Sequence, residues 1–75
     1  MRVRVNLMGA LKAKTPDGGQ LELAEDANID DVLQLLDIPL THVQVVMVNG
    51  NPQHDRSLSL SENDELTVLA PVGGG

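Results

Sequence analysis

The sequence contains no phenylalanine, tyrosine, tryptophan or cysteine. Without aromatic rings the protein has no platforms on which nucleic-acid bases stack, and its core must be built from valine, leucine, isoleucine, alanine and methionine. Without cysteine it has no disulfide, no thiolate nucleophile and no thiolate metal ligand.

Positive charge is also scarce, because 5 lysines and arginines stand against 11 acidic residues, which leaves a net charge of −6. An acidic chain repels phosphate backbones and anionic lipids, so we expect neither nucleic acid nor a membrane as partner, whereas a basic protein surface is compatible. Acidity that serves solubility alone is an equally good explanation. No apolar run is long enough to cross a bilayer, and no signal-peptide core is present, so we expect a cytoplasmic protein.

The 75 residues, of which 41% are apolar, are enough for one small folded domain. We place this domain at residues 1–70 and a flexible tail at residues 71–75. A domain of this size has little room for a large cleft, so it is expected to work through a surface or a terminus.

Two half-buried strands are predicted near the N-terminus, because residues 2–7 and 20–23 alternate between polar and apolar side chains. Residues 15–19 combine proline, aspartate and glycine in a strong turn signal. Together these segments predict a hairpin. Residues 8–14 fit either an extension of the first strand or a loop.

A short amphipathic helix is predicted next, because Asn28 is a good N-cap and Asp30 and Asp31 place negative charge in the first turn. Apolar side chains then recur at helical spacing, at Ile29, Val32, Leu33 and Leu36. Pro39 cannot continue a helix, so we expect the helix to end before it.

The second half of the chain reads as further strands. Residues 43–48 are rich in β-branched side chains, residues 49–50 form an Asn-Gly turn signal, and Pro52 is expected to block immediate continuation. Residues 58–60 predict a short strand, and residues 65–69 predict the last one. The order favours an α+β fold in which one main helix covers one face of a mixed sheet of four to five strands.

Residues 45–48 are apolar on both sides of the predicted strand, although one helix covers only one face of the sheet. One of two sets must therefore point away from the helix, namely Val43, Val45 and Met47 or Val46 and Val48. Exposed apolar surface indicates a docking patch, unless loops cover it or the residues only reflect strand propensity. Val45, Met47 and Leu69 are our candidates for a partner-binding surface.

The chain ends in Gly73, Gly74 and Gly75, after Pro71 and Val72. Glycine has no Cβ, so such a tail is flexible, spans roughly 20 Å with the residues just before it, and fits a narrow channel. Its carboxylate is unreactive until it is activated, for example as an acyl-adenylate, and a sulfur donor then converts it to a thiocarboxylate. The simpler interpretation is a frayed terminus.

The ending of the chain resembles that of the MoaD/ThiS-type ubiquitin-like sulfur carriers. Residues 63–75 reproduce an acidic turn, a strand and a Pro-Val-x-Gly-Gly sequence. Residues 48–50 match the family's Val-Asn-Gly turn, and residues 58–65 match its stretch of leucine, polar turn and Asp-Glu. The resemblance covers nearly the whole chain, and its specific motifs lie in the last dozen residues.

The resemblance implies a β-grasp fold and a carrier that is not itself an enzyme. A ubiquitin-activating-type enzyme would use ATP to adenylate Gly75, which would then bear the thiocarboxylate, and the chain itself would bind no cofactor. Gly73 and Gly74 would thread into the partner while Pro71 and Val72 seat the tail. The ending is closest to the small subunit of molybdopterin synthase, so the large subunit is a candidate sulfur acceptor. Similar carriers serve thiamine thiazole synthesis, cysteine synthesis and tRNA thiolation.

Other groups indicate no catalytic or metal site. His42 and His54 have no neighbours at metal-ligand spacing, and the cluster of Glu62, Asp64 and Glu65 reads as a solvated turn. Two further functions remain open. A protein modifier would use the same tail to form isopeptide bonds, and a simple binding module would carry an inert tail.

Overall fold

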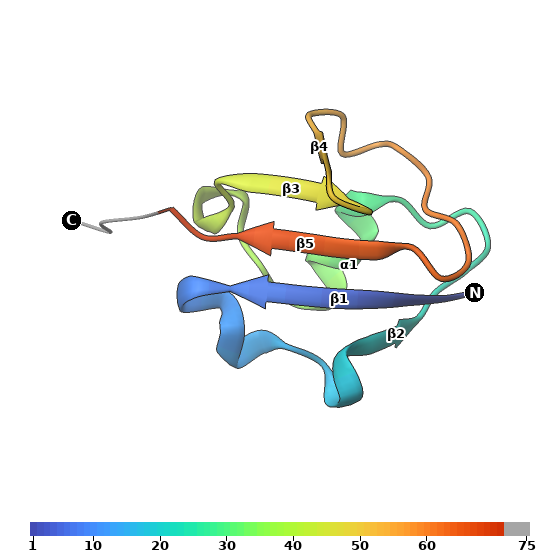
Figure 1. The fold of residues 1–75 in the computed structure, drawn as a ribbon, viewed down its shortest axis with the longest axis horizontal. Coiled ribbons are helices and arrows are strands. Elements are labelled where there is room, and N and C mark those ends of the chain that lie inside the picture. The colour runs from blue at the N-terminus through green and yellow to red at the C-terminus, as the bar shows by residue number, and fades with distance from the viewer. Residues whose placement is uncertain (72–75) are drawn as a thin grey trace.

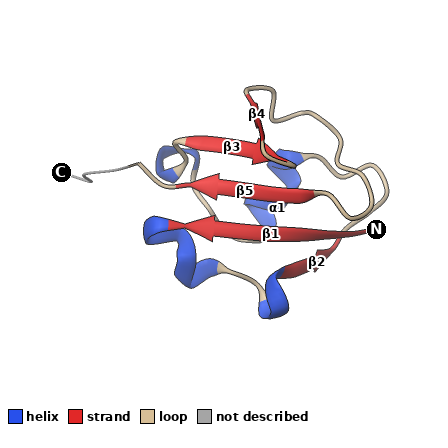
Figure 2. Ribbon diagram, viewed as in Figure 1, coloured by secondary structure: helices blue, strands red, loops and turns tan. Residues whose placement is uncertain are grey.

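The computed structural model describes residues 1–71, so the predictions for Val72, Gly73, Gly74 and Gly75 lie outside the described residues. The elements are β1 (Arg2–Met8), β2 (Gln20–Glu22), α1 (Ile29–Leu35), β3 (Val45–Val48), β4 (Asn51–Gln53) and β5 (Glu65–Leu69), with 3₁₀ helices at Gly9–Lys14, Asp17–Gly19 and Leu40–His42 (Figures 1 and 2). The predicted order of strands and helix is confirmed. The ambiguous segment at residues 8–14 divides into the last residue of β1 and a 3₁₀ helix.

Within residues 1–71, the strands form a five-stranded sheet in the order β2-β1-β5-β3-β4. The central pair, β1 and β5, is parallel, and the other neighbours are antiparallel. The predicted hairpin of β1 and β2 is confirmed. Helix α1 crosses behind the sheet in Figure 1, which is the β-grasp arrangement that the resemblance implied.

Helix α1 begins where the sequence predicts. The side chain of Asn28 accepts a hydrogen bond from the backbone N–H of Asp31, and the Asp31 carboxylate accepts one from the backbone N–H of Asn28, both at 2.9 Å. This reciprocal capping box satisfies donors that the first turn of a helix would otherwise leave unpaired. The helix buries Ile29, Val32 and Leu33 against the sheet.

The core lies between α1 and the inner face of the sheet. β1 alternates strictly between exposed and buried residues. The buried hydrophobic side chains are all aliphatic: Val3, Val5, Leu7, Leu11, Leu23, Ala27, Ile29, Val32, Leu33, Ile38, Val46, Val48, Leu60, Leu66 and Val68. Thr67 of β5 is buried as well. As expected for a sequence without aromatic residues, the core consists of valine, leucine, isoleucine and alanine. Met1 packs partly buried against this core.

The fourth strand lies earlier in the chain than we predicted. β4 covers Asn51–Gln53, whereas residues 58–60 contribute only an isolated bridge between Ser59 and Asn28. Leu60 is buried in the core and Leu58 is partly exposed. This segment has the sequence pattern of a strand because its backbone is extended. It lies beside the start of α1 and forms hydrogen bonds with the backbone of Ala27 and Ile29.

The prediction that Pro52 blocks a strand is also wrong. Val48 and Asn51 flank the two-residue turn and form the closing pair of the hairpin, so the next pair, Met47 and Pro52, does not exchange hydrogen bonds. The nitrogen of Pro52 therefore points to the outside of the sheet, where a missing N–H costs nothing. Proline on such an edge also hinders pairing with another chain.

The third strand is shorter than predicted. Leu40–His42 forms a 3₁₀ helix, and regular pairing begins at Val45 and not at residue 43. Val43 instead packs partly buried against the core, just before the chain enters the sheet. β-branched residues before a strand therefore extended the apparent strand signal beyond its true start.

Candidate functional site

The central strand β5 leads directly to the tail. It lies between β1 and β3, and its last residue, Leu69, pairs with Met8 on one side and Val45 on the other. β5 therefore ends where β1 ends and β3 begins, at the left of the sheet in Figure 1. Ala70 and Pro71 follow at this end of the sheet.

An apolar row crosses the outer face of the sheet at this end. It consists of Met8, Leu69 and Val45, which occupy one register across β1, β5 and β3. Their chain neighbours Leu7 and Val46 are buried on the helix side, so alternation turns the row away from α1. Met8 is 44% exposed and Val45 36%, although Leu69 between them is half-buried.

The outer face becomes more polar with distance from the tail. The next register joins Asn6, Thr67 and Met47, and Met47 is half-buried. The register after it pairs Arg4 with Glu65. The apolar surface is thus concentrated at the end of β5 that leads into the tail.

The structure brings together Val45, Met47 and Leu69, the three residues predicted for a partner surface, on one face of two neighbouring strands. The sequence left open which of two sets of side chains faces the helix. The structure shows that Val46 and Val48 are the buried set. Sequence reasoning missed Met8. Its place opposite the buried positions of β1 was a usable signal, but the pairing of β1 with β5 was needed to bring it beside Leu69.

The turn after β1 lies beside Ala70, the residue that follows β5. Gly9 directly follows β1 with a φ of 66°, a conformation that favours glycine. A Cβ at this position would lie 3.4 Å from the Cβ of Ala70. The positive φ, and not a lack of space beside Ala70, therefore accounts for glycine at this turn.

Beside this contact, a groove of about 650 Å³ lies between the two 3₁₀ segments that flank Ala70 and Pro71. Lys14 and His42 supply its basic groups. The ammonium group of Lys14 donates to the backbone carbonyl of Asp37 at 2.7 Å and lies 3.9 Å from its carboxylate. The predicted tail-seating residue Pro71 thus lies beside one apolar row and one weakly basic groove.

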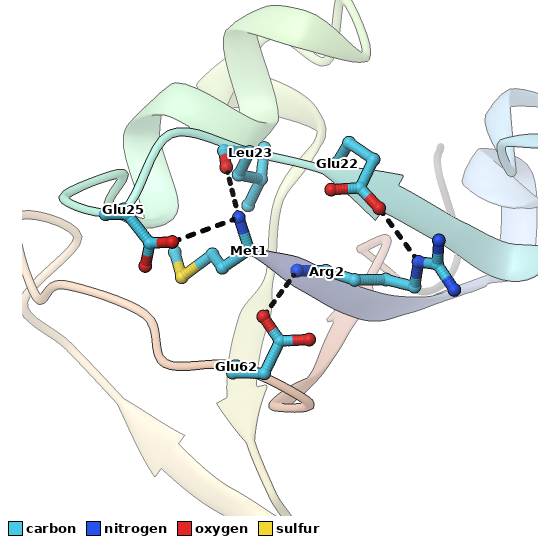
Figure 3. Close-up of polar contacts among 6 residues, drawn as sticks. All are labelled: Met1, Arg2, Glu22, Leu23, Glu25 and Glu62. Atoms are coloured by element: carbon cyan, nitrogen blue, oxygen red, sulfur yellow. Dashed lines mark hydrogen bonds and ion pairs between the residues drawn. The ribbon is translucent and has the colours of Figure 1, made fainter.

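The predicted acidic cluster lies at the opposite end of β5 and holds the fold together. Glu62 accepts a hydrogen bond from the backbone N–H of Arg2 at 3.0 Å (Figure 3). Asp64 accepts one from the side-chain amide of Asn49 at 2.9 Å, and another from a backbone N–H of its own turn at 2.8 Å. The side-chain oxygen of Asn49 in turn accepts a hydrogen bond from the backbone N–H of Glu65 at 2.9 Å. These contacts join β1, β3 and β5.

Asp55, in the loop after β4, has a displaced pKa. The hydroxyl group and the backbone N–H of Ser57 donate to its carboxylate at 2.5 and 3.0 Å, and these bonds hold the pKa of Asp55 below its usual value. The group is fully exposed, so it is a loop-stabilising carboxylate and not a poised acid or base.

The part of the chain that the structure describes contains neither a metal-binding cluster nor a membrane-spanning helix. No group of three or more histidine, aspartate or glutamate side chains within residues 1–71 is arranged to hold a metal ion. None of the helices in this part is both long and apolar enough to span a bilayer.

A model of the ThiS family matches residues 5–75. Among solved structures, the chain is similar to SAMP1 from Haloferax volcanii, with a TM-score of 0.72 and 21% identity over the whole of both chains. H. volcanii small archaeal modifier protein 1 in a second structure matches with a TM-score of 0.71 and 22% identity, over 95% of this chain and 98% of that one. A complex of subunits 1 and 2 of molybdopterin-converting factor from Helicobacter pylori contains a chain that matches with a TM-score of 0.65 and 21% identity, again over both whole chains. No curated protein matches the chain by sequence.

Proposed function

This chain belongs to the ThiS family, and we propose that it is a sulfur carrier whose working group is the carboxylate of Gly75. In this role the chain is a protein substrate that other enzymes load and unload, and none of its side chains is a catalyst. Because activation consumes ATP, we place this cycle in the cytoplasm.

The chemistry requires two steps. An oxygen of the Gly75 carboxylate attacks the α-phosphorus of ATP, and the bond to pyrophosphate breaks, which leaves an acyl-adenylate. Sulfide then attacks the acyl carbon, and AMP leaves, which yields a thiocarboxylate and releases a proton. Glycine leaves the acyl carbon unhindered, and the absence of cysteine leaves no competing thiol on this chain.

The observation that carries the proposal is the position of the apolar row. Met8, Leu69 and Val45 lie at the end of β5 from which the chain continues through Pro71 into the family-matched residues up to Gly75. An activating enzyme that covers this row would hold the tail at a fixed entry point. Apolar anchors at the centre of such a contact supply most of its binding energy.

The sulfur acceptor is proposed to be a cofactor-synthesising enzyme. Molybdopterin synthesis is the first candidate, because the ending resembles that of the synthase small subunit and one similar structure is a complex of two molybdopterin-converting factor subunits. The large subunit of molybdopterin synthase would then be the second partner. Carriers for thiamine thiazole, cysteine or tRNA thiolation are the alternatives within the same chemistry.

The test is intact mass spectrometry of the chain after incubation with ATP, sulfide and an adenylating enzyme of the ubiquitin-activating type. The expected product is heavier by the replacement of one oxygen with sulfur. Deleting Gly75 should abolish this product, while the free energy of unfolding stays within about 0.5 kcal/mol, because the buried core is built from residues 3–68. An unchanged mass with several such enzymes would overturn the proposal.

A second candidate is a protein modifier, since two of the similar structures are of the small archaeal modifier protein 1. The same acyl-adenylate would then be attacked by a lysine amine of a target protein, which displaces AMP and forms an isopeptide bond. Conjugates of higher mass that survive reductant, with no thiocarboxylate formed, would favour this function. If loss of Gly75 changed neither assay, the chain would act as a binding module.

A further inference from the structure

The outer strand β2 is fastened to β1 through alternate residues. The amino group of Met1 donates to the carbonyl of Leu23, and the N–H of Leu23 donates to the carbonyl of Met1, both at 2.7 Å (Figure 3 shows the first). In an antiparallel pair, such doubly bonded positions alternate with positions at which both backbones point away from each other. The next position along the strands, Arg2 opposite Glu22, is therefore of the second kind.

The contacts of β1 confirm this alternation. The backbone N–H of Arg2 points away from β2 and reaches the carboxylate of Glu62, and the N–H of Arg4 bonds to the carbonyl of Asp64 (Figure 3 shows the first). On the opposite strand, the backbone N–H and C=O groups of Glu22 must then point outward, to the free side of the sheet. β2 is the last strand at this edge within residues 1–71.

A groove of about 540 Å³ runs between this edge and helix α1. Leu23, Ala27 and Leu35 form its apolar floor. Leu35 is 63% exposed, more than any other large hydrophobic side chain in the described part of the chain. Leucine on a folded surface is unremarkable by itself, but here it borders an unpaired strand edge.

The geometry of the sheet connects the edge with the groove. Leu21 pairs with the buried Val3, so the side chains at positions 21 and 23 face the helix side of the sheet. A strand added beside β2 would place every second side chain on that same side, over the groove and against Leu35. Its backbone would meet the outward N–H and C=O groups of β2.

We propose that the β2 edge and the α1 groove together bind an extended peptide of a partner protein, with alternating apolar side chains and lysine or arginine at its flanks. The charge of the groove selects this partner. Asp26 and Asp31 lie along it, and it is lined by no lysine or arginine. Glu22 borders it as well, but its carboxylate is paired with Arg2 at 2.9 Å, so the free negative charge comes from the two aspartates. A cationic peptide is attracted to this rim, whereas an acidic one is repelled.

This surface is separate from the proposed sulfur chemistry. It contains neither Pro71 nor any member of the apolar row of Met8, Leu69 and Val45. A carrier held through β2 would therefore keep its tail and row available to an activating enzyme. The inference does not depend on the proposed function and can hold if that function is wrong.

The test uses a capped ten-residue peptide with alternating valine and threonine in the centre and two lysines at each end, titrated into the ¹⁵N-labelled full chain. We expect saturable NMR shifts at residues 20–24 and 31–35, and protection of the Glu22 amide from hydrogen exchange. Replacing the peptide's lysines by glutamates should weaken binding at least about tenfold. Methylating alternate peptide nitrogens, in the two possible parities, should abolish binding in one parity only.

Two matched pairs of variants test the protein side. Leu35→Gln should weaken binding about tenfold, since it removes apolar contact, whereas Leu40→Gln alters a 51% exposed leucine outside the groove and should have no effect. Glu22→Pro removes the outward N–H and should abolish binding, while Glu22→Thr keeps it and should retain most binding. Absence of saturable shifts, or equal affinity for the Leu35 and Leu40 variants, would overturn the proposal. The peptide-methylation arm decides the outcome if the proline variant does not fold.

Discussion

The two ends of the central strand β5 are built in opposite ways. At its start, the turn that carries Glu62 and Asp64 is held by side-chain hydrogen bonds to β1 and to Asn49, beside the β3–β4 hairpin. At its end, Leu69 lies between Met8 and Val45, and the outer face shows apolar side chains to solvent. Polar groups therefore fasten one end, while the other end is left with surface that favours contact with another protein.

This difference explains how so small a protein fixes the point at which the chain leaves the sheet after β5. Directional hydrogen bonds at the start of β5 fix its register between β1 and β3, and the register places Leu69 at the opposite margin. The end that leads into the tail is held by backbone hydrogen bonds, such as the one from the N–H of Gln44 to the carbonyl of Leu69 at 2.7 Å. Its apolar row is consequently available for a partner, at a small cost in exposed hydrophobic area.

The largest expected effect on stability is at the fastened end. Asp64→Ala removes the acceptor of two hydrogen bonds, so the free energy of unfolding should fall by about 2 kcal/mol, at about 1 kcal/mol for each bond. Urea denaturation followed by circular dichroism measures it. Asp17→Ala, at an exposed position in the 3₁₀ segment Asp17–Gly19, is the control and should change little. Equal effects of the two variants would mean that the turn does not fasten β5.

The apolar end should respond in the opposite way. Val45→Asp should lower kcat/KM for adenylation of the tail about tenfold, because it places a charge in the proposed contact, yet alter the free energy of unfolding by less than about 1 kcal/mol. Gln20→Asp adds the same charge at the far edge of the same face and serves as control. If both variants were adenylated at the wild-type rate, the apolar row would not be the partner surface.

The smallest effect is expected in the loop that leads back to the fastened end. The pKa of Asp55 is lower in the folded chain than in the unfolded chain, so its contribution to stability is present above about pH 4 and is lost as the pH falls below that value. Asp55→Asn and Ser57→Ala should each flatten the acid side of the stability curve slightly. The measurement is the midpoint of urea unfolding at a series of pH values from about 2 to about 6, a range that includes the titration of this carboxylate. A curve as steep as that of the wild type would show that this contact does not contribute.

Much of the fold could be predicted because its signals are local. The capping box at Asn28 and the alternation in β1 each depend on residues a few positions apart. The strand signal failed where an extended segment was held by other contacts, as at residues 58–60, and where a proline occupies a position that needs no N–H, as at Pro52. Both errors concern hydrogen bonds to distant parts of the chain, which periodicity does not report.

The candidate site likewise contains residues that the sequence indicated and residues that only tertiary contacts revealed. Val45 and Met47 belong to one of the two sets that the sequence left open, and Leu69 belongs to the last predicted strand. Met8 was missed because it is about sixty residues from Leu69 in sequence. The groove beside β2 was missed for the same reason. Its lining comes from the end of β2, from the loop that follows β2 and from α1, and only packing brings these segments together.

By itself, the sequence determined the aliphatic core, the start of the helix, the tight turns and the glycine-rich ending, since each follows from side-chain chemistry or from neighbours a few residues away. Only the tertiary structure decided that β1 and β5 lie parallel at the centre of the sheet, and that the β2 edge faces a groove. The parallel pairing joins residues far apart in the chain, and many registers satisfy the same local pattern. The register that forms is the one in which a single helix covers the inner side chains while the turn before β5 bonds to β1 and β3.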